Sequence, residues 1–445
     1  MNNLIKVRKF ILKSFIFFSL LIPAQSTKAQ ESKNFASLTE VLELVKNNNS
    51  LFKNADFQTQ LAELTRKTAV GNVLNPRIPT SFQSIDNVNQ QVSYLPGAAF
   101  GMPAGTFKEV TMGQQYISTL NIQPQFDLFN MANIAQIKTA KINEQLVENQ
   151  NQMNEQILFD KINSIYSNIL SFNAQKETIL ENIATAENIL KITQNKFNEG
   201  ISRKQELNEA EVNLINLQDK LEQIEMNTKI QYQSLNLFFE NLISPTLLQS
   251  LWDVQKQDSI VKTNNQLLVQ NATLQTQMAE QEFKVLKYQN IPVVSFTSNY
   301  NWQNLSNDRF FSKSSSWINY NYVGLKISYD LPTTVMKLSN AKSKAFQAEI
   351  LKNNAEHSIK EAESKNNQLI LEYEKATKQL LNFQKIYELK KDTYEKNFNQ
   401  YSENILPLDK LLISQNDLIM SKLNIISALA NIEFTKNRID INNRY

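Results

Sequence analysis

The sequence contains no cysteine. Disulfide bonds, thiol nucleophiles, cysteine-ligated metals and a lipid-modified cysteine behind a leader are therefore excluded. Glycine and proline are also scarce, with 7 and 10 among 445 residues, and this scarcity favours long uninterrupted helices. The single histidine, His357, has no second histidine with which to share a metal. We expect it to be a solvated helix residue, and we expect no metal site and no cofactor.

Signals of catalysis and of nucleic-acid binding are missing too. The chain shows no paired carboxylates, no Ser/His arrangement and no glycine-rich phosphate cradle, so an enzyme is not expected. The formal charge of +3 is misleading, because residues 1–29 hold five Lys or Arg and no acid. Subtracting those five leaves about −2 for the rest of the chain, which offers no basic face for nucleic acid.

The N-terminus is typical of a secretory signal peptide. Cationic residues (Lys6, Arg8, Lys9, Lys13) precede an apolar core at 15–22, and small polar residues follow, with cleavage expected after Ala29. This core is far shorter than the ~20 residues that a membrane-spanning helix requires, and no later segment supplies such a run. Membrane insertion is therefore expected only from strands.

Glycines and prolines divide the rest of the chain. Between Gln125 and Ser244 there is no proline and only one glycine, Gly200, and between Thr333 and Leu406 there is neither. Both intervals are predicted to be long helices. Residues 96–113 hold four of the seven glycines and two prolines, so this stretch is predicted to be a loop. This loop could bind external ligands, but a plain extracellular turn is the favoured interpretation.

Both of these predicted helical intervals carry heptad seams of apolar residues, which favour coiled-coil packing. Gly200 interrupts the first seam and predicts the turn of a helical hairpin. The second interval is predicted to turn near 399–406. The first seam consists of Leu158, Ile162, Ile165, Ile169, Phe172, Ile179, Ile183, Ala186 and Leu190, then Leu207, Ala210, Leu214, Leu217, Leu221 and Ile224. Tyr373, Tyr387 and Tyr394 of the second seam are expected to pack rather than to line a passage.

Short stretches recur in the same order in the two halves, for example Ile78-Pro79-Thr80-Ser81-Phe82 and Ile291-Pro292-Val293-Val294-Ser295-Phe296. Such repetition indicates a duplicated architecture. The expected organisation is a signal peptide at 1–29, a first repeat at 30–240, a linker at 241–258, a second repeat at 259–437 and a tail at 438–445. Each repeat comprises a helix, two strands and a long helical hairpin; the hairpins turn near 198–203 and 399–406.

The strands are expected at about 78–90 and 115–128 in the first repeat and at about 291–303 and 317–331 in the second. Near 116–128 and 294–331 apolar and polar residues alternate, so one face of each strand is apolar and the other is polar. In an outer-membrane barrel the apolar face contacts lipid and the polar face lines water. Aromatic residues near the strand ends fit interfacial belts: Tyr116, Phe129, Tyr300, Trp302, Trp317, Tyr320 and Tyr322. Four strands do not close a barrel, so other copies of the chain must complete it.

These residues together resemble the TolC family of outer-membrane efflux proteins. The likeness rests on the opening segment at 37–48, on prolines before strands (Pro76, Pro79, Pro292), on the strand ends at 125–129 and 328–332, and on the turn at 196–201 followed by Glu206-Leu207. It implies a homotrimer in which three chains build one 12-stranded β-barrel, continued by an α-helical barrel across the periplasm. It also implies two partners, a periplasmic membrane-fusion adaptor and an inner-membrane pump, for a passive duct of a tripartite efflux or type I secretion system.

The resemblance also supplies candidate site residues. Acids just past the hairpin turns would ring the periplasmic entrance, and by position Glu206 and Asp409 are those acids. In three copies Glu209 would add to the acidic ring, and Arg203 and Lys410 would anchor a closed gate. A purely structural alternative is that these acids are carboxylates at helix N-termini, where the helix dipole favours them. The turns themselves would dock the adaptor, through Phe197, Gly200, Ile201, Phe398 and Tyr401. The second turn departs from the family by lacking a glycine, by about two extra residues, and by Leu412 where many members have a second acid.

A second function class remains open. A periplasmic coiled-coil scaffold or adaptor without a membrane barrel would share the signal peptide and the heptads, although amphipathic strands argue against it. If the chain is a duct, its partners determine the cargo, which could be small molecules, metal ions or polypeptides. The sequence does not identify it.

Overall fold

The computed structural model describes residues 31–240, 243–254, 263, 265–331 and 333–445. The expected signal peptide at 1–29 and parts of the expected linker at 241–258 lie outside these residues. The chain divides into two compact units. We call the first the tip unit (up to residue 50, 161–257 and 375–434) and the second the sheet unit (51–160, 258–374 and 435–445).

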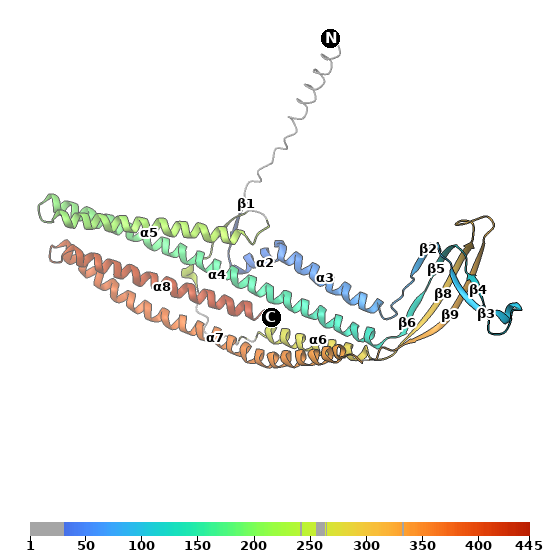
Figure 1. Cartoon of the computed structure of the whole chain (residues 1–445). Coiled ribbons are helices and arrows are strands. Elements are labelled where there is room, and N and C mark those ends of the chain that lie inside the picture. The colour runs from blue at the N-terminus through green and yellow to red at the C-terminus, as the bar shows by residue number, and fades with distance from the viewer. Residues whose placement is uncertain (1–30, 241–242, 255–262, 264, 332) are drawn as a thin grey trace, which may run out of the picture. The chain divides into compact units, whose positions relative to one another are not determined.

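Helices dominate the described residues and strands interrupt them in each half, as expected (Figure 1). The helices are α2 (Leu38–Asn48), α3 (Ser50–Gly71), α4 (Met131–Asn198), α5 (Lys204–Asn236), α6 (Leu267–Tyr288), α7 (Val335–Ser402) and α8 (Leu408–Asn442), with short 3-10 turns η1 (Gly97–Phe100) and η2 (Leu251–Asp253). The strands are β1 (Glu31–Phe35), β2 (Thr80–Asp86), β3 (Gln91–Pro96), β4 (Phe107–Met112), β5 (Tyr116–Ile122), β6 (Gln125–Phe129), β7 (Ile243–Leu247), β8 (Val293–Ser306) and β9 (Ser316–Ser328). The duplication is plain in α4 and α7, which both have 68 residues.

The helical hairpins of the tip unit pack along the heptad seams. Ile179 and Ala186 of α4 meet Leu217 and Ile224 of α5, and Ile419 of α8 joins the same buried cluster. All five side chains are less than 6% exposed. Burying such aliphatic side chains contributes roughly 1.5–3 kcal/mol each, so packing of the seam stabilises helices whose other faces are polar.

A parallel strand pair in the tip unit was not expected from the sequence. β1 pairs with β7, with Phe35 opposite Leu247. Phe35 is 1% exposed and stacks on Phe239 at 5.9 Å between ring centroids. The side-chain amide of Asn49, in the break between α2 and α3, donates to the carbonyl oxygen of Phe238 over 2.8 Å. The single helix expected at the start of the first repeat is therefore two helices.

The sheet unit is built on one antiparallel sheet in the order β2-β5-β8-β9, with β6 continuing β5 along the same edge of β8. Ile122 of β5 lies opposite Tyr300, and Gln125 of β6 lies opposite Thr297, so β5 and β6 follow one register past Pro124. Proline has no N–H to donate to a neighbouring strand. The carbonyl oxygen of Pro124 nevertheless accepts from the N–H of Ser298 over 2.9 Å.

The two faces of this sheet differ in polarity, because residues opposite each other in an antiparallel pair share a face. Leu120 lies opposite Trp302 and Phe296 lies between Phe126 and Leu325, which makes one face apolar. The other face is polar: Asn301 lies between Asn121 of β5 and Tyr320 of β9, and Asn299 lies opposite Tyr322.

Two tyrosines therefore differ from the expectation that they belong to a lipid-facing aromatic belt. Tyr320 and Tyr322 lie on the polar face, whereas Tyr300 and Trp302 lie on the apolar face. The reason is that apolar residues of β9 change face along the strand, from Ile318, Tyr320 and Tyr322 to Val323, Leu325 and Ile327.

Two further expectations are corrected. The predicted loop at 96–113 is in part the connection of a β-hairpin and in part its second strand, because β3 pairs with β4 from Gln91 opposite Met112 to Pro96 opposite Phe107. The glycines and prolines that predicted a loop lie mostly in its connection. The predicted C-terminal tail at 438–445 is mostly helix, since α8 continues to Asn442, where buried Ile439 and Ile441 extend its apolar face.

Candidate functional site

The first hairpin turn ends α4 with a residue in the left-handed backbone region. Gly200 has a φ of +74°. The N–H of Ile201 donates to the carbonyl oxygen of Lys196 over 2.8 Å, and the N–H of Gly200 donates to that of Phe197 over 3.0 Å. This pair of bonds satisfies carbonyls at the helix end and requires the left-handed residue, which is why glycine suits this position.

The second hairpin turn repeats this geometry with an asparagine in place of the glycine. Asn404 has a φ of +63°. The N–H of Ile405 donates to the carbonyl oxygen of Gln400 over 2.8 Å, and the N–H of Asn404 donates to that of Tyr401 over 3.1 Å. The expected insertion of about two residues is therefore not in the turn, since both turns have the same length and hydrogen bonds. Asparagine is one of the few other residues that tolerate the left-handed region.

This shared geometry changes which residues of the two turns correspond. Counting from the left-handed residues, Tyr401 corresponds to Phe197 and Ile405 corresponds to Ile201. Phe398, a predicted docking residue, lies one turn earlier in α7 than Tyr401, with its ring centroid 6.1 Å from that of Tyr394. Glu206 of the first turn corresponds to Lys410, and Asp409 corresponds to Gln205.

Glu206 and Asp409 lie in the first turns of α5 and α8, and Glu209 lies about one turn later in α5. Glu206 is partly buried, and its Oε2 accepts from the backbone N–H of Arg203 over 3.2 Å. Oε1 of Glu209 accepts from the side-chain amide of Gln205 over 3.0 Å. Asp409 is exposed in the first turn of α8. The positions of Glu206 and Asp409, and the bond that Glu206 accepts from Arg203, agree with carboxylates that stabilise helix N-termini.

The predicted cations are not joined to these acids within one chain. Arg203 and Lys410 are exposed. Among the described residues no ion pair joins either of them to Glu206 or Asp409. The ion pairs near the hairpin ends join Lys390 to Asp417 and Lys396 to Asp392. A gate ring of the predicted kind would need contacts from other copies of the chain.

Lys196 and Tyr401 tie the two hairpins together, and sequence reasoning missed this contact. The Lys196 ammonium donates to the backbone carbonyl oxygen of Tyr401 and lies 3.9 Å from the centroid of its ring. The Tyr401 hydroxyl is 2.7 Å from Oγ1 of Thr193. Burial lowers the pKa of Lys196, and the charge of Glu206 partly opposes this effect. Tyr401 is only 3% exposed, so it supports the turn from inside rather than presenting itself to a partner.

The residues that the turns do present are aliphatic. Ile201 is 55% exposed and Ile405 is 68% exposed, and they occupy the same position of the shared turn. The ring of Phe197 is partly covered, with the Lys204 ammonium 5.7 Å from its centroid. Ile405 was not among the predicted docking residues, because the expected register of the second turn was displaced.

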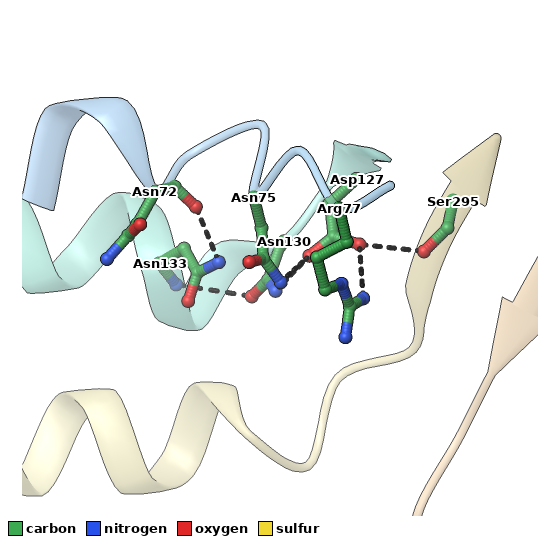
Figure 2. A network of polar contacts seen from close by, with 7 residues as sticks. All are labelled: Asn72, Asn75, Arg77, Asp127, Asn130, Asn133 and Ser295. Atoms are coloured by element: carbon green, nitrogen blue, oxygen red, sulfur yellow. Dashed lines mark hydrogen bonds and ion pairs between the residues drawn. The ribbon is translucent and has the colours of Figure 1, made fainter. Parts of the chain in front are cut away.

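A second set of functional candidates lies in the sheet unit, where α4 begins directly after β6. Figure 2 shows Asp127 of β6 between Ser295 of β8 and Asn130 before α4. Oδ1 of Asp127 accepts from the Ser295 hydroxyl over 2.8 Å, and Oδ2 accepts from the Asn130 amide over 2.9 Å. The Arg77 guanidinium lies 3.7 Å from Oδ1, and Asp127 is 2% exposed. A buried carboxylate needs such partners, because an unpaired one is strongly destabilising.

Asparagines extend this network to the neighbouring segments. The Asn75 amide lies 3.4 Å from Oδ2 of Asp127, and the Asn133 amide donates to the carbonyl oxygen of Asn72 over 2.8 Å. Oδ1 of Asn130 accepts from the N–H of Asn133 over 3.2 Å, which caps the start of α4. The network therefore fixes the direction in which the helix leaves the strand.

Metal-binding clusters and apolar spanning helices are both missing from the described residues. No group of three or more His, Cys, Asp or Glu in these ranges is arranged to hold a metal ion. No helix within the same ranges combines the length and hydropathy needed to cross a membrane.

Comparison with known proteins gives matches among solved structures only. No protein-family model and no curated protein matches the chain. The outer membrane protein VceC from Vibrio cholerae is 12% identical with a TM-score of 0.66, over 90% of this chain and 94% of that one. The CmeC outer membrane channel of Campylobacter jejuni is 13% identical with a TM-score of 0.73, over 94% and 89%. The open state of the MtrE outer membrane channel of Neisseria gonorrhoeae is 12% identical with a TM-score of 0.70, over 91% and 88%. The chain has the fold of these channels along nearly its whole length.

Proposed function

We propose that this chain is a TolC-family channel of the bacterial outer membrane, working without catalysis as a passive duct. Its strands would cross the outer membrane as part of a homotrimeric 12-stranded barrel, and its helices would extend into the periplasm. There an adaptor and an inner-membrane pump would deliver cargo, in a tripartite efflux or type I secretion system. The fold supports this proposal, because the solved structures that share it are outer membrane proteins.

The observation that carries the proposal is a sheet with an apolar face and two open edges. Within the described residues β2 pairs only with β5, and β9 pairs only with β8. On the apolar face of β9 Val323, Leu325 and Ile327 are 64%, 68% and 71% exposed. β8 and β9 have 14 and 13 residues, more than the ~9–11 that a membrane strand needs. An open edge in lipid leaves backbone groups unpaired, so such a sheet requires neighbours on both sides.

The hairpin tips support the periplasmic part of the proposal. Exposed Ile201 and Ile405 at equivalent turn positions offer small apolar contacts for an adaptor, beside the predicted turn residues Phe197 and Gly200. Glu206, Glu209 and Asp409 would supply negative charge to the entrance in three copies, since rings of carboxylates set the selectivity of pores. Arg203 and Lys410 would pair with acids of neighbouring copies.

Cross-linking of the cysteine-free chain tests the trimer directly. Gln83 of β2 and Ile318 of β9 are exposed on the same face of the sheet. The double variant Gln83→Cys/Ile318→Cys should give covalent dimers and trimers with a short bis-maleimide in outer membranes, because β2 of one copy would lie beside β9 of the next. Each single variant should give none.

Purification completes the test. We expect a trimer in detergent with β-signal in circular dichroism and ion conductance in planar bilayers. The contrary outcome is a monomer that salt washing releases from the envelope and that forms no cross-linked trimers as the double variant. The chain would then be the periplasmic scaffold or adaptor considered above.

A further inference from the structure

The turn between β8 and β9 holds a bulky residue in an unfavourable conformation. Phe311 has a φ of +57°, in the left-handed region that side chains other than Gly, Asn and Asp rarely adopt. Hydrogen bonds fix the turn on both sides: the Ser306 hydroxyl accepts from the N–H of Asp308 over 3.1 Å, and the Ser315 hydroxyl donates to the carbonyl oxygen of Ser312 over 2.6 Å. Strain of this kind persists only where surrounding contacts impose it.

The conformation places the Phe311 ring among other aromatic rings. Its centroid is 6.2 Å from that of Phe82 in β2 and 6.2 Å from that of Trp317 in β9. The adjacent Phe310 meets Tyr116 of β5 at 4.8 Å with the rings nearly perpendicular. The turn therefore reaches across the sheet and gathers aromatic residues from three strands.

This aromatic cluster lies on the apolar face of the sheet. Phe82 is opposite Leu120, which is opposite Trp302, and Trp317 is opposite Asn304 of the same face. The rings remain accessible, with Phe82, Phe311 and Trp317 each more than half exposed. In the proposed barrel this face contacts lipid, so the cluster continues the lipid-facing surface at the ends of the strands farthest from the helices.

Two cations flank the aromatic pair within the turn sequence Arg309-Phe310-Phe311-Ser312-Lys313. Both side chains are exposed, and neither has an ion-pair partner among the described residues. The nearby acid, Asp308, accepts from the Ser312 hydroxyl at 3.3 Å. Exposed cations beside exposed rings match a ligand that has a negative head and an apolar tail.

We propose that this turn is a binding site for a phosphorylated lipid of the outer leaflet. Arg309 and Lys313 would bind the headgroup phosphates, and Phe310, Phe311, Phe82 and Trp317 would pack against the acyl chains. Arginine and lysine suit phosphate, and aromatic rings suit the boundary between headgroups and acyl chains. The inference rests on the proposed function, because it needs the apolar face of the sheet to contact lipid. One bound lipid per copy would fix the depth of the barrel in the membrane.

Binding of purified lipid A to the purified full chain in detergent tests this site, measured by native mass spectrometry with phosphorylated and dephosphorylated lipid A. Arg309→Gln/Lys313→Gln should weaken binding of the phosphorylated form by about thirtyfold, as expected for two cations at an anionic surface, and should leave the dephosphorylated form unchanged. Phe311→Gly keeps the backbone conformation favourable but removes the ring, so it should weaken both forms. Lys108→Gln, an exposed cation in β4, is the matched control and should change neither.

Two results would overturn the inference. One is phosphorylated lipid A that binds Arg309→Gln/Lys313→Gln as tightly as the wild type, and the other is equal loss in Lys108→Gln. The same samples are checked for trimers and for conductance in planar bilayers. A wild type that forms conducting trimers but does not prefer phosphorylated lipid A refutes only the lipid site, whereas a wild type that forms no such trimers refutes the proposed function.

Discussion

Lys196 donates to the backbone carbonyl oxygen of Tyr401, so the end of the first hairpin holds the end of the second. The contact is buried, and the ring of Tyr401 lies under the same ammonium. Ile189, Ala210, Leu408 and Leu411 pack around Tyr401 and complete an apolar cluster. The tips of the two hairpins in one chain are therefore one packed structure.

Tyr401→Phe should loosen this structure without opening a cavity. It removes the hydroxyl that contacts Thr193 at 2.7 Å and should reduce the local stability by about 1 kcal/mol. Hydrogen exchange of the amides at 193–201 and 398–405 should become roughly fivefold faster. Tyr387→Phe on the same helix is the control and should leave the exchange at both turns unchanged. Equal acceleration in the control would mean that the hydroxyl contact does not hold the tips.

Asp127 should be indispensable to the junction between β6 and α4. Asp127→Ala leaves Asn130 and Ser295 without their shared acceptor and Arg77 without its ion pair, and should lower the free energy of unfolding by about 1–3 kcal/mol. Asp330, at the corresponding end of β9, is 81% exposed and pairs with Lys337. Asp330→Ala should therefore cost less than about 1 kcal/mol in urea unfolding. Comparable losses in the two variants would show that burial of Asp127 does not matter.

In the proposed barrel, Tyr320 and Tyr322 should narrow the water-filled pore. They share the polar face with Asn301 and Asn299 and are about half exposed. Tyr320→Ala/Tyr322→Ala should raise single-channel conductance in planar bilayers, because pore width limits the ion flow. Leu325→Ala, on the apolar face of the same strand, should leave conductance unchanged. An unchanged conductance in the tyrosine variant would place the polar face away from the pore.

Asp160 predicts a pH-dependent stability. It lines a cavity of about 420 Å³ between α4, α7 and α8 in the sheet unit, and its Oδ1 is buried without a hydrogen-bond partner among the described residues. Burial raises its pKa above the usual 3.8, although Arg438 opposes the shift. Between 3.8 and the raised pKa the folded state binds more protons than the unfolded state, so this group lowers stability as the pH rises through that window.

Asp160→Asn removes the charge and should raise the midpoint of urea unfolding at pH 7. The gain should shrink as the pH falls toward 3.8, where the wild-type carboxyl is protonated in the folded state. Asp56→Asn, an exposed residue of α3, should change the midpoint little at either pH. A wild type with the same midpoint as Asp160→Asn at pH 7 would show that the charge is fully solvated.

Sequence patterns predicted the parts of the fold that depend on local spacing. The heptad seam through Ile179, Ala186, Leu217 and Ile224 is buried as a cluster, because a period of 3.5 residues places these side chains on one stripe of each helix. Gly200 marked the first turn because only glycine adopts its backbone conformation without cost. The alternation near 116–128 predicted strands for the same geometric reason.

Contacts between distant segments were not predictable in this way. β1 and β7 are five-residue strands about 210 positions apart, and β1 has four polar residues in succession and no alternation of polarity. The second turn lies within the expected range near 399–406, but its residues were matched to the first turn in the wrong register, because Phe398-Asn399 repeats Phe197-Asn198 while the left-handed residue is Asn404. Lys196 lies at the end of α4, and its buried role becomes visible only when Tyr401 lies beside it.

The long register of β8 and β9 has a consequence for how the sheet forms. Thirteen consecutive residue pairs join these strands, from Leu305 opposite Ser316 to Val293 opposite Ser328, across a short connection. Tyr116 and Ser306, by contrast, are 190 positions apart when β5 meets β8. Closing a short loop loses less chain entropy than closing a long one, so the β8–β9 hairpin should assemble first and serve as a template. Newly made chains would add β5, β6 and then β2 to it, and would leave the β2 edge as the last to find its neighbour.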